Sequence, residues 1–370
     1  MSGSAKRAIA FFLPGLHGGG AERIVLNLTQ GIAERGLAVD LVLAAATGPL
    51  RDHVAPGVRV VDLASPRVLR SIGPLARYLR RERPRALVSS MSHANLVALW
   101  AARLGRAGTP VVVTEHNTMS QSALEQGWLE RHLWPPVLRS FYPWASHVVA
   151  VSREAAADFA RTAGIPRERI EVIYNPVIMP GMKARIRETS DHPWFGPGQP
   201  PVVLGIGRLT RQKDFPTLIR AFAGVRRQRP VRLIILGEGE DRSALEALVA
   251  ELGLGDDVAL PGFRDNPLAY LAASSLFVLS SAWEGLPTVL IEALAAGARV
   301  VSTDCPSGPR EILQEGRLGT LVPVGDVAAL TAAMAAALEC PPHPAPAEAL
   351  EPFTREAAVD NYLRLIESVP

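Results

Sequence analysis

Short apolar runs alternate with amphipathic segments along most of the chain, and glycine, proline or a capping residue bounds many of them. Short apolar runs of this kind predict strands that are buried on both faces. The predicted strands are 8–13, 38–44, 86–90, 111–114, 148–151, 170–174, 202–206, 232–236, 258–260, 276–279 and 299–303. Apolar positions three or four apart predict helices before Gly36, over 66–85, between Ser152 and Gly164, from about Phe215, and over 287–297, 327–338 and 354–368. Strand, glycine turn and helix recur in both halves, which predicts an α/β protein with two Rossmann-like domains.

Residues 177–200 interrupt this pattern, because they are rich in proline, glycine and charge and show little periodicity. Such a stretch is typical of a linker between domains. The sequence therefore predicts a first domain over 1–176, a linker over 177–200, a second domain over 201–352 and a terminal helix within 353–370.

Length and composition agree with two globular domains, since 370 residues with 48% hydrophobic and 20% charged residues can bury two cores. No apolar run approaches the ~18 residues of a membrane span. The balance of 39 basic against 36 acidic residues gives no charge-based reason to expect nucleic acid as a partner. Cys305 and Cys340 provide neither a disulfide framework nor a zinc spacing, which indicates a reducing cytoplasm.

The segment 276–297 contains the strongest candidate site. Its strand leads into Trp283, Glu284 and Gly285, and Pro287 then opens a helix that Gly297 closes. The free N–H groups of a helix N-terminus attract anions, and a glycine lets a ligand approach the backbone closely. Glu292 lies in the second turn of the helix, so the two carboxylates can hold opposite ends of one elongated ligand with a phosphate between them.

Further glycines and cations follow other predicted strands of the second domain. Strand 202–206 leads into GRLTRQK, whose Arg208 and Lys213 suit the oxygens of a diphosphate. Strand 232–236 is followed by Gly237 and Gly239, and strand 258–260 by Gly262 and Phe263.

The first domain contributes Gly18, Gly19 and Gly20 after strand 8–13, and His116 just beyond strand 111–114, where open α/β sheets bind ligands. The glycine loop lacks the G-x-G-x-x-G pattern of nicotinamide-binding domains. Asp40 also lies early in strand 38–44, whereas a ribose-binding acid belongs at the end of that strand. Nicotinamide binding is therefore a weak alternative.

Two surface features each have more than one interpretation. Residues 66–85 predict a helix with seven arginines against the single acid Glu82, which is either a solvated crossover helix or a surface that contacts anionic lipid. Residues 127–144 gather aromatic side chains that either form core, line an acceptor site or lie at a lipid headgroup layer.

EGLPTVLIE resembles the E-x7-E motif of retaining glycosyltransferases of family four, which have the GT-B architecture. Four further elements of that family, the glycine loop, EHN, GRLTRQK and PGF, occur in the expected order, and only Asp214 departs from the family's usual glycine or asparagine. The resemblance implies two Rossmann-like domains that face each other across a cleft, acceptor-side first and nucleotide-sugar-binding second, with the C-terminal helix crossing back to the first. It implies Glu284, His116, Arg208 and Lys213 as catalytic residues. The implied donor-binding residues are Gly19, Gly20, Arg208, Lys213, Gly237, Gly239, Gly262, Phe263, Gly285, Leu286, Pro287, Thr288 and Glu292.

The function implied is transfer of a hexosyl or N-acetylhexosaminyl group from a nucleotide-diphosphate sugar to a glycan or polyprenyl-linked acceptor in polysaccharide assembly, with retention. DCPSGPREIL favours a UDP-sugar. The sequence has no Asp-x-Asp, so neither a metal nor a cofactor is expected. A cytoplasmic location at the inner face of the membrane follows if the basic and aromatic segments contact lipid. A nucleotide-sugar epimerase, a nicotinamide-dependent oxidoreductase and a non-enzymatic nucleotide-binding protein are the alternatives.

Overall fold

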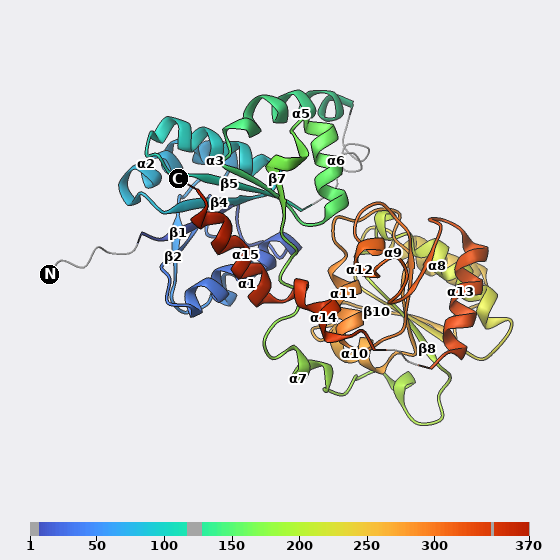
Figure 1. The fold of residues 1–370 in the computed structure, drawn as a ribbon. Helices are drawn as coiled ribbons and strands as arrows, with labels where there is room; N and C mark the ends of the chain where they lie inside the picture. The colour runs from blue at the N-terminus through green and yellow to red at the C-terminus, as the bar shows by residue number, and fades with distance from the viewer. Residues whose placement is uncertain (1–6, 117–127, 342–343, 370) are drawn as a thin grey trace. The chain divides into compact units, whose positions relative to one another are not determined.

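The computed structural model describes residues 7–116, 128–341 and 344–369. The chain divides into two compact units (Figure 1). Unit 1 consists of Met1–Pro176 together with Phe353–Pro370, and unit 2 is Val177–Pro352.

Unit 1 is built on a sheet of seven parallel strands in the order β3-β2-β1-β4-β5-β6-β7. The strands are β1 (Ile9–Leu13), β2 (Val39–Leu43), β3 (Val58–Asp62), β4 (Ala86–Ser90), β5 (Val111–Glu115), β6 (His147–Ala150) and β7 (Ile170–Val172). The strand order reverses between β1 and β4. In open α/β sheets a ligand site forms at the carboxyl end of the strands at such a reversal.

Both faces of this sheet are covered, which explains why its strands are continuously apolar. In β1, Ala10 and Phe12 belong to the core on one face, whereas Phe11 and Leu13 belong to the core on the other. The helices are α1 (Gly20–Glu34), α2 (Ile72–Glu82), α3 (Ser92–Gly105), α5 (Trp128–Phe141), α6 (Arg153–Ala163) and α15 (Arg355–Glu367). The 3₁₀ turns are η1 (Pro49–His53), η2 (Val68–Ser71), η3 (Tyr142–Trp144) and η4 (Arg167–Arg169).

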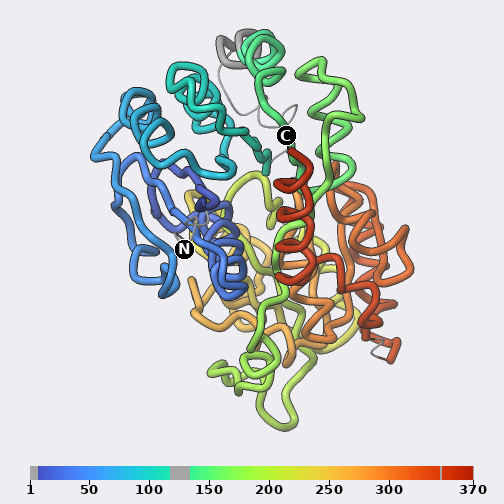
Figure 2. Tube along the Cα trace, turned by 60° about the vertical axis from the view of Figure 1, so that its left-hand side comes forward, coloured from blue at the N-terminus to red at the C-terminus, as the bar shows by residue number. Residues whose placement is uncertain are grey.

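The C-terminal helix α15 packs beside α1 in unit 1, as the resemblance implies (Figure 2). A Cβ on Gly31 would lie 2.8 Å from Cγ2 of Val359, so the glycine permits the close approach of the two helices. Val359 and Tyr362 are buried in the same core as β1, and Arg355 forms an ion pair with Glu34 at 2.7 Å. This helix is therefore part of the core of unit 1.

Unit 2 contains six parallel strands in the order β10-β9-β8-β11-β12-β13. They are β8 (Val202–Ile206), β9 (Arg232–Leu236), β10 (Val258–Gly262), β11 (Leu276–Leu279), β12 (Val300–Thr303) and β13 (Thr320–Val322). Here the order reverses between β8 and β11, which places the expected ligand site at the loops that follow these two strands.

The helices of unit 2 are α7 (Met182–Ile186), α8 (Phe215–Arg226), α9 (Arg242–Glu251), α10 (Pro267–Ala273), α11 (Thr288–Ala295), α12 (Pro309–Ile312), α13 (Val327–Glu339) and α14 (Ala347–Leu350). The 3₁₀ turns are η5 (Pro193–Phe195), η6 (Arg211–Lys213) and η7 (Glu351–Phe353), and η7 ends at the boundary with unit 1. One core unites α8, α9 and α13 with the sheet through residues such as Phe222, Leu245 and Met334.

The helix expected over 66–85 is shorter in the structure. Its first part is the 3₁₀ turn η2, and α2 itself spans only Ile72–Glu82. Arg83 ends the helix with a left-handed φ of 45°, and Pro84 after it cannot continue the helix. The arginines of this segment are therefore divided between two elements of different geometry.

Residues 177–200, which the sequence assigns to a linker, belong to unit 2 in the structure. Arg185 donates to the carbonyl of Asp265 at 2.5 Å, and Asn266 donates back to the carbonyl of Arg185 at 3.0 Å. Tyr270 donates to Asp191 and also stacks against Phe195 with ring centroids 5.6 Å apart. These contacts order a segment whose composition alone indicates a loop.

Candidate active site

The loops after β8 and β11 meet at the reversal point of unit 2. There Nζ of Lys213 lies 2.5 Å from Oε1 of Glu284, and the hydroxyl of Ser281 donates to the same oxygen at 2.6 Å. The side chain of Lys213 is only 15% exposed, and that of Glu284 only 7%. The structure thus brings together two residues that the sequence assigns to separate motifs.

The shape of the loop after β8 depends on two special positions. Gly207 leaves room for the stem of Lys213, since a Cβ on the glycine would lie 3.1 Å from its carbons. Asp214 has a left-handed φ of 44° and caps α8 by accepting from the amide of Thr217 at 3.4 Å. Glycine, asparagine and aspartate tolerate this φ better than most residues, which accounts for the departure from the family's pattern at Asp214.

Backbone and side-chain hydrogen bonds hold the two loops together. Ala282 donates to the carbonyl of Gln212 at 2.8 Å, and the Gln212 amide donates to the carbonyl of Trp283 at 2.9 Å. The hydroxyl of Ser280 donates to the carbonyl of Lys213 at 2.7 Å. Lys213 and Glu284 are therefore positioned by their backbones as well as by their mutual attraction.

The N-terminus of α11 lies next to this pair in the chain. Its N-cap is Pro287, which offers no side-chain acceptor. The loop after β12 supports this turn: Gly308, with a φ of 103°, packs so close that a Cβ would lie 2.3 Å from Cδ of Pro287, and Ser307 donates to the carbonyl of Gly285 at 2.6 Å. An uncapped helix N-terminus of this kind is suited to an anionic group.

The other predicted residues of this motif have different environments. Gly285, Leu286 and Pro287 are buried, whereas Thr288 and Glu292 are partly exposed. Arg208 is exposed and has no ion-pair partner in the described parts of the chain. It is a cation whose guanidinium is available to a ligand.

The predicted glycines after β9 and β10 have a clear structural role. A Cβ on Gly237 would lie 1.9 Å from the carbonyl oxygen of Gly207, and one on Gly239 would lie 2.2 Å from that of Leu209. Gly262 has a φ of 82°, and Phe263 after it is 64% exposed. Gly237 and Gly239 therefore let the loop after β9 pack against the loop that contains Arg208.

The glycine loop of unit 1 already contains an internal anion. The carboxylate of Glu22 accepts from the amides of Gly18 at 2.6 Å and Gly19 at 3.1 Å. Gly19 is the N-cap of α1 and has no side chain to cap the helix, so Gly20 begins the helix without a side-chain cap. The amide of Gly19, which the sequence assigns to donor binding, is occupied by Glu22.

His116 follows β5, and both ring nitrogens are buried without a hydrogen-bond partner among the described residues. Burial lowers the pKa of this imidazole to about 4, so it is neutral at physiological pH. His116 belongs to unit 1, whereas Glu284, Arg208 and Lys213 belong to unit 2.

The neighbouring Glu115 forms a buried network that the sequence does not reveal. Its carboxylate accepts from Ser92 at 2.8 Å, from Asn95 at 3.0 Å and from the hydroxyl of Tyr142. Burial raises the pKa of Glu115, and these three donors oppose the rise. The network joins the end of β5 to α3 and η3, and it thereby fixes the backbone that leads to His116.

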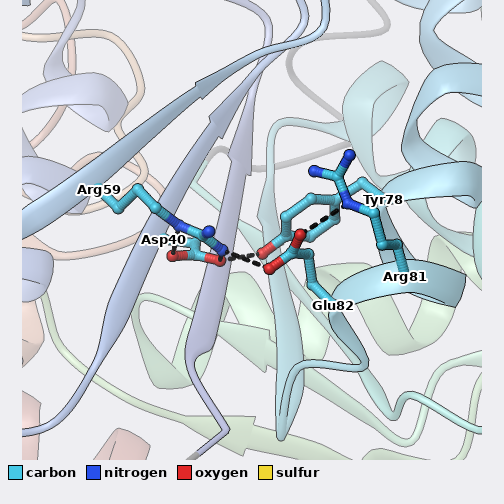
Figure 3. A network of polar contacts seen from close by, with 5 residues as sticks. All are labelled: Asp40, Arg59, Tyr78, Arg81 and Glu82. Carbon is cyan, nitrogen blue, oxygen red and sulfur yellow. Dashed lines mark hydrogen bonds and ion pairs between the residues drawn. The ribbon is translucent and has the colours of Figure 1, made fainter.

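A second buried network settles the role of Asp40 (Figure 3). Arg59 holds its carboxylate with two bonds of 2.8 Å and 2.5 Å, and Tyr78 donates to it at 2.5 Å. Arg59 also contacts Glu82 at 2.9 Å. Asp40 lies in the amino-terminal half of β2 and is 2% exposed, so it is not available to a ribose. This geometry removes the main candidate for a nicotinamide-ribose ligand.

Two parallel-sheet units with a cationic, anion-accepting site at a strand-order reversal define the class of GT-B glycosyltransferases. The solved structure of Anabaena Alr3699/HepE in complex with UDP and glucose matches 98% of this chain and 100% of its own, with a TM-score of 0.77 and 23% identity. At this identity the match establishes the fold.

Sequence comparisons establish the family. The model described as "Glycosyltransferase Family 4" matches residues 18–178, and "Glycosyl transferases group 1" matches residues 187–352. The lipopolysaccharide core biosynthesis glycosyltransferase LpsE of Rhizobium meliloti is 30% identical over 95% of this chain and 97% of its own length. The Campylobacter jejuni N-acetylgalactosamine-N,N'-diacetylbacillosaminyl-diphospho-undecaprenol 4-alpha-N-acetylgalactosaminyltransferase is 33% identical over 63% of this chain and 61% of its own. The chain belongs to glycosyltransferase family 4.

Proposed function

We propose that the protein transfers a hexosyl or N-acetylhexosaminyl group from a UDP-sugar to a lipid-linked or growing glycan with retention of anomeric configuration. The buried Lys213–Glu284 pair beside the N-terminus of α11 is the observation that carries this proposal. UDP in the HepE complex supports the choice of base. The diphospho-undecaprenol acceptor in the name of the Campylobacter relative and the lipopolysaccharide core in that of LpsE support the acceptor class.

In this mechanism the cations stabilise the leaving group. Arg208, Lys213 and the N-terminal amides of α11 neutralise the charge that develops on the diphosphate as the anomeric C–O bond breaks. Glu284 and His116 orient the sugar, and Glu292 accepts hydrogen bonds from the ribose hydroxyls. The acceptor oxygen attacks from the face that the diphosphate leaves, and a phosphate oxygen takes its proton. Bond breaking and bond formation on one face retain the configuration without a covalent intermediate.

Product analysis tests the reaction class. The protein is incubated with UDP-sugars and GDP-sugars labelled in the sugar, together with a polyprenyl-diphosphate-linked glycan. Transfer predicts release of UDP and a labelled lipid whose new linkage has the donor's anomeric configuration by NMR. An epimerase would instead return a labelled nucleotide sugar of changed stereochemistry, and an oxidoreductase would require a nicotinamide cofactor.

Turnover should persist when divalent metals are removed. In the described parts of the chain no three His, Cys, Asp or Glu side chains are grouped as metal ligands. Arg208, Lys213 and α11 can supply the positive charge that a metal would otherwise give to the diphosphate. The measurement is the rate of UDP release with and without excess EDTA. A rate that falls on chelation and recovers with Mg²⁺ or Mn²⁺ would contradict a metal-free mechanism.

We also propose that unit 1 contacts anionic lipid at the cytoplasmic face of the membrane, which is where a polyprenyl-linked acceptor would be met. Among the described helices none is both long and apolar enough to span a bilayer. Arg77 and Arg80 on α2 are exposed and lack carboxylate partners in the described structure, whereas Arg81 contacts Glu82 at 2.8 Å. Each cation near an anionic surface contributes ~1 kcal/mol.

Replacement of Arg77, Arg80 and Arg81 by glutamine should therefore release the protein from phosphatidylglycerol vesicles without changing hydrolysis of the donor. Co-sedimentation measures the binding. The matched control replaces Arg220, Arg227 and Arg229 around α8, which removes the same charge from unit 2 and should leave vesicle binding intact. If the α2 variant and the native protein bound the vesicles equally, residues 66–85 would be a solvated crossover segment and not a lipid-binding surface.

A further inference from the structure

A cavity of about 480 Å³ lies in unit 1 between η2 and the first turn of α3. It is lined by Arg67, Val68, Leu69, Arg70 and His93. Its volume falls within the range of small-molecule sites. The sequence treats these arginines as part of one basic helix, whereas the structure separates them from Arg77 and Arg80 on α2.

The 3₁₀ geometry of η2 explains why two arginines line the same cavity. Residues three apart eclipse each other in a 3₁₀ turn, and the amide of Arg70 donates to the carbonyl of Arg67 at 2.9 Å. Both side chains are exposed, and neither has a carboxylate partner in the described parts of the chain. By contrast, Arg59 in the same unit is neutralised by Asp40 and Glu82. The cavity therefore has two cations that no acid of the described structure neutralises.

The same cavity also presents apolar surface. Leu69 is 72% exposed, the largest exposure among the described large hydrophobic residues, and Val68 beside it is half-buried. His93, in the first turn of α3, also lines the cavity, and partial burial lowers the pKa of its imidazole. At neutral pH the ring is thus an uncharged hydrogen-bonding group. Cations beside an exposed apolar side chain suit a ligand whose anionic group is attached to a hydrocarbon chain.

Both elements that line the cavity follow the carboxyl ends of strands in the sheet of unit 1. η2 follows the carboxyl end of β3, and α3 follows the carboxyl end of β4, the strand at the reversal point. The N-cap of α3 is Met91, which has a φ of 80° and makes no side-chain cap. In the same turn Ser92 donates to the buried Glu115 at 2.8 Å, so the two arginines are the cations of the cavity itself. The glycine loop and His116 follow strands at this same carboxyl edge.

We propose that this cavity binds the diphosphate of a prenyl-diphosphate-linked acceptor. Arg67 and Arg70 hold phosphate oxygens, His93 hydrogen-bonds to the same group, and Val68 and Leu69 pack against the first prenyl unit. The inference rests on the proposed function, because it assigns a binding site to the acceptor of that reaction. It divides the basic segment into a pocket for the acceptor's diphosphate and a separate lipid-facing surface on α2.

Calorimetry with farnesyl diphosphate, used below its micelle concentration, tests the site in the full-length protein. Saturating UDP is present so that the probe does not occupy Arg208 and Lys213. Arg67→Gln/Arg70→Gln should weaken binding of farnesyl diphosphate ~10²-fold, since each arginine loses charge-assisted hydrogen bonds. Arg77→Gln/Arg80→Gln removes the same charge outside the cavity and should change the affinity by less than about twofold. Farnesol, which lacks the diphosphate, should bind far more weakly than farnesyl diphosphate to the native protein.

Three results would overturn the proposal: an equal loss in both double variants, native binding by Arg67→Gln/Arg70→Gln, or farnesol binding as tight as that of farnesyl diphosphate. If Arg67→Gln/Arg70→Gln no longer bound phosphatidylglycerol vesicles but kept its affinity for farnesyl diphosphate, the cavity would bind a membrane headgroup instead. Failure of the proposed function is separate, because it would appear as no UDP binding or no sugar transfer by the native protein.

Discussion

Glu284→Gln is expected to lose ~10²- to 10³-fold in turnover while binding UDP nearly as well as the native protein. The carboxylate lies in a buried loop, where it accepts from Lys213 and Ser281. Its charge can stabilise the positive charge that develops at the anomeric carbon, an interaction that strengthens chiefly in the transition state. Glutamine preserves the shape and removes the charge. The measurements are kcat for UDP release and the dissociation constant of UDP by calorimetry.

Glu292→Ala is the matched comparison, because it changes the second carboxylate of the same motif. Its proposed contact with the ribose exists in the ground state as well as the transition state, so its loss should mainly weaken UDP binding. If Glu284→Gln kept its turnover and Glu292→Ala kept its affinity for UDP, the roles assigned to the two acids would be wrong.

Lys213→Ala should lower both turnover and stability. The sequence assigns Lys213 only to the oxygens of a diphosphate, a role whose loss would lower turnover and leave the fold intact. In the structure, removal of this ammonium takes an ion-pair partner away from Glu284, which is 6% exposed. Breaking a buried ion pair at one partner typically costs ~3–5 kcal/mol. Thermal unfolding of the ligand-free protein and kcat for UDP release measure the two effects.

The double variant Lys213→Ala/Glu284→Gln separates the effect on stability from the effect on turnover. A neutral glutamine needs no counter-charge, so the double variant should recover much of the lost stability and remain inactive. Arg208→Ala provides the control, since its exposed guanidinium has no ion-pair partner in the described structure and its loss should reduce turnover without lowering the unfolding temperature. A double variant as unstable as Lys213→Ala would show that the ion pair is not the cause.

Local patterns were sufficient to predict most of the strands and the capped helices α6 and α13. Ser152 caps α6 by accepting from Ala155 at 3.1 Å, and Asp326 caps α13 by accepting from Ala329 at 2.9 Å. α3 was not predicted, because it buries Val97, Ala98, Leu99 and Ala101 and has little polar face. Periodicity is weak in a helix that is apolar nearly all round. β3 and β13 were also missed, since only Val58 in β3 and only Val322 in the short β13 are buried.

The contacts within the site depended on tertiary structure that no local pattern contains. Gln212, Lys213 and Glu284 meet because β8 and β11 are neighbours in the sheet, although their loops are far apart in the sequence. The sequence identified Lys213 and Glu284 as site residues and could not show that they form a pair. The sequence placed Glu115 only in the EHN motif and did not reveal its network, because its partners Ser92, Asn95 and Tyr142 come from other elements.

The return of α15 to unit 1 governs the order in which the chain can fold during its synthesis. Val359, Tyr362 and Ile366 complete a core whose other members belong to the first part of the chain. At ~5–20 residues per second, a ribosome needs roughly 10 to 35 seconds to make the intervening unit 2. Until then α1 exposes the apolar surface that α15 will cover. The nascent protein therefore presents an uncovered apolar face throughout the synthesis of unit 2, and unit 1 is completed last.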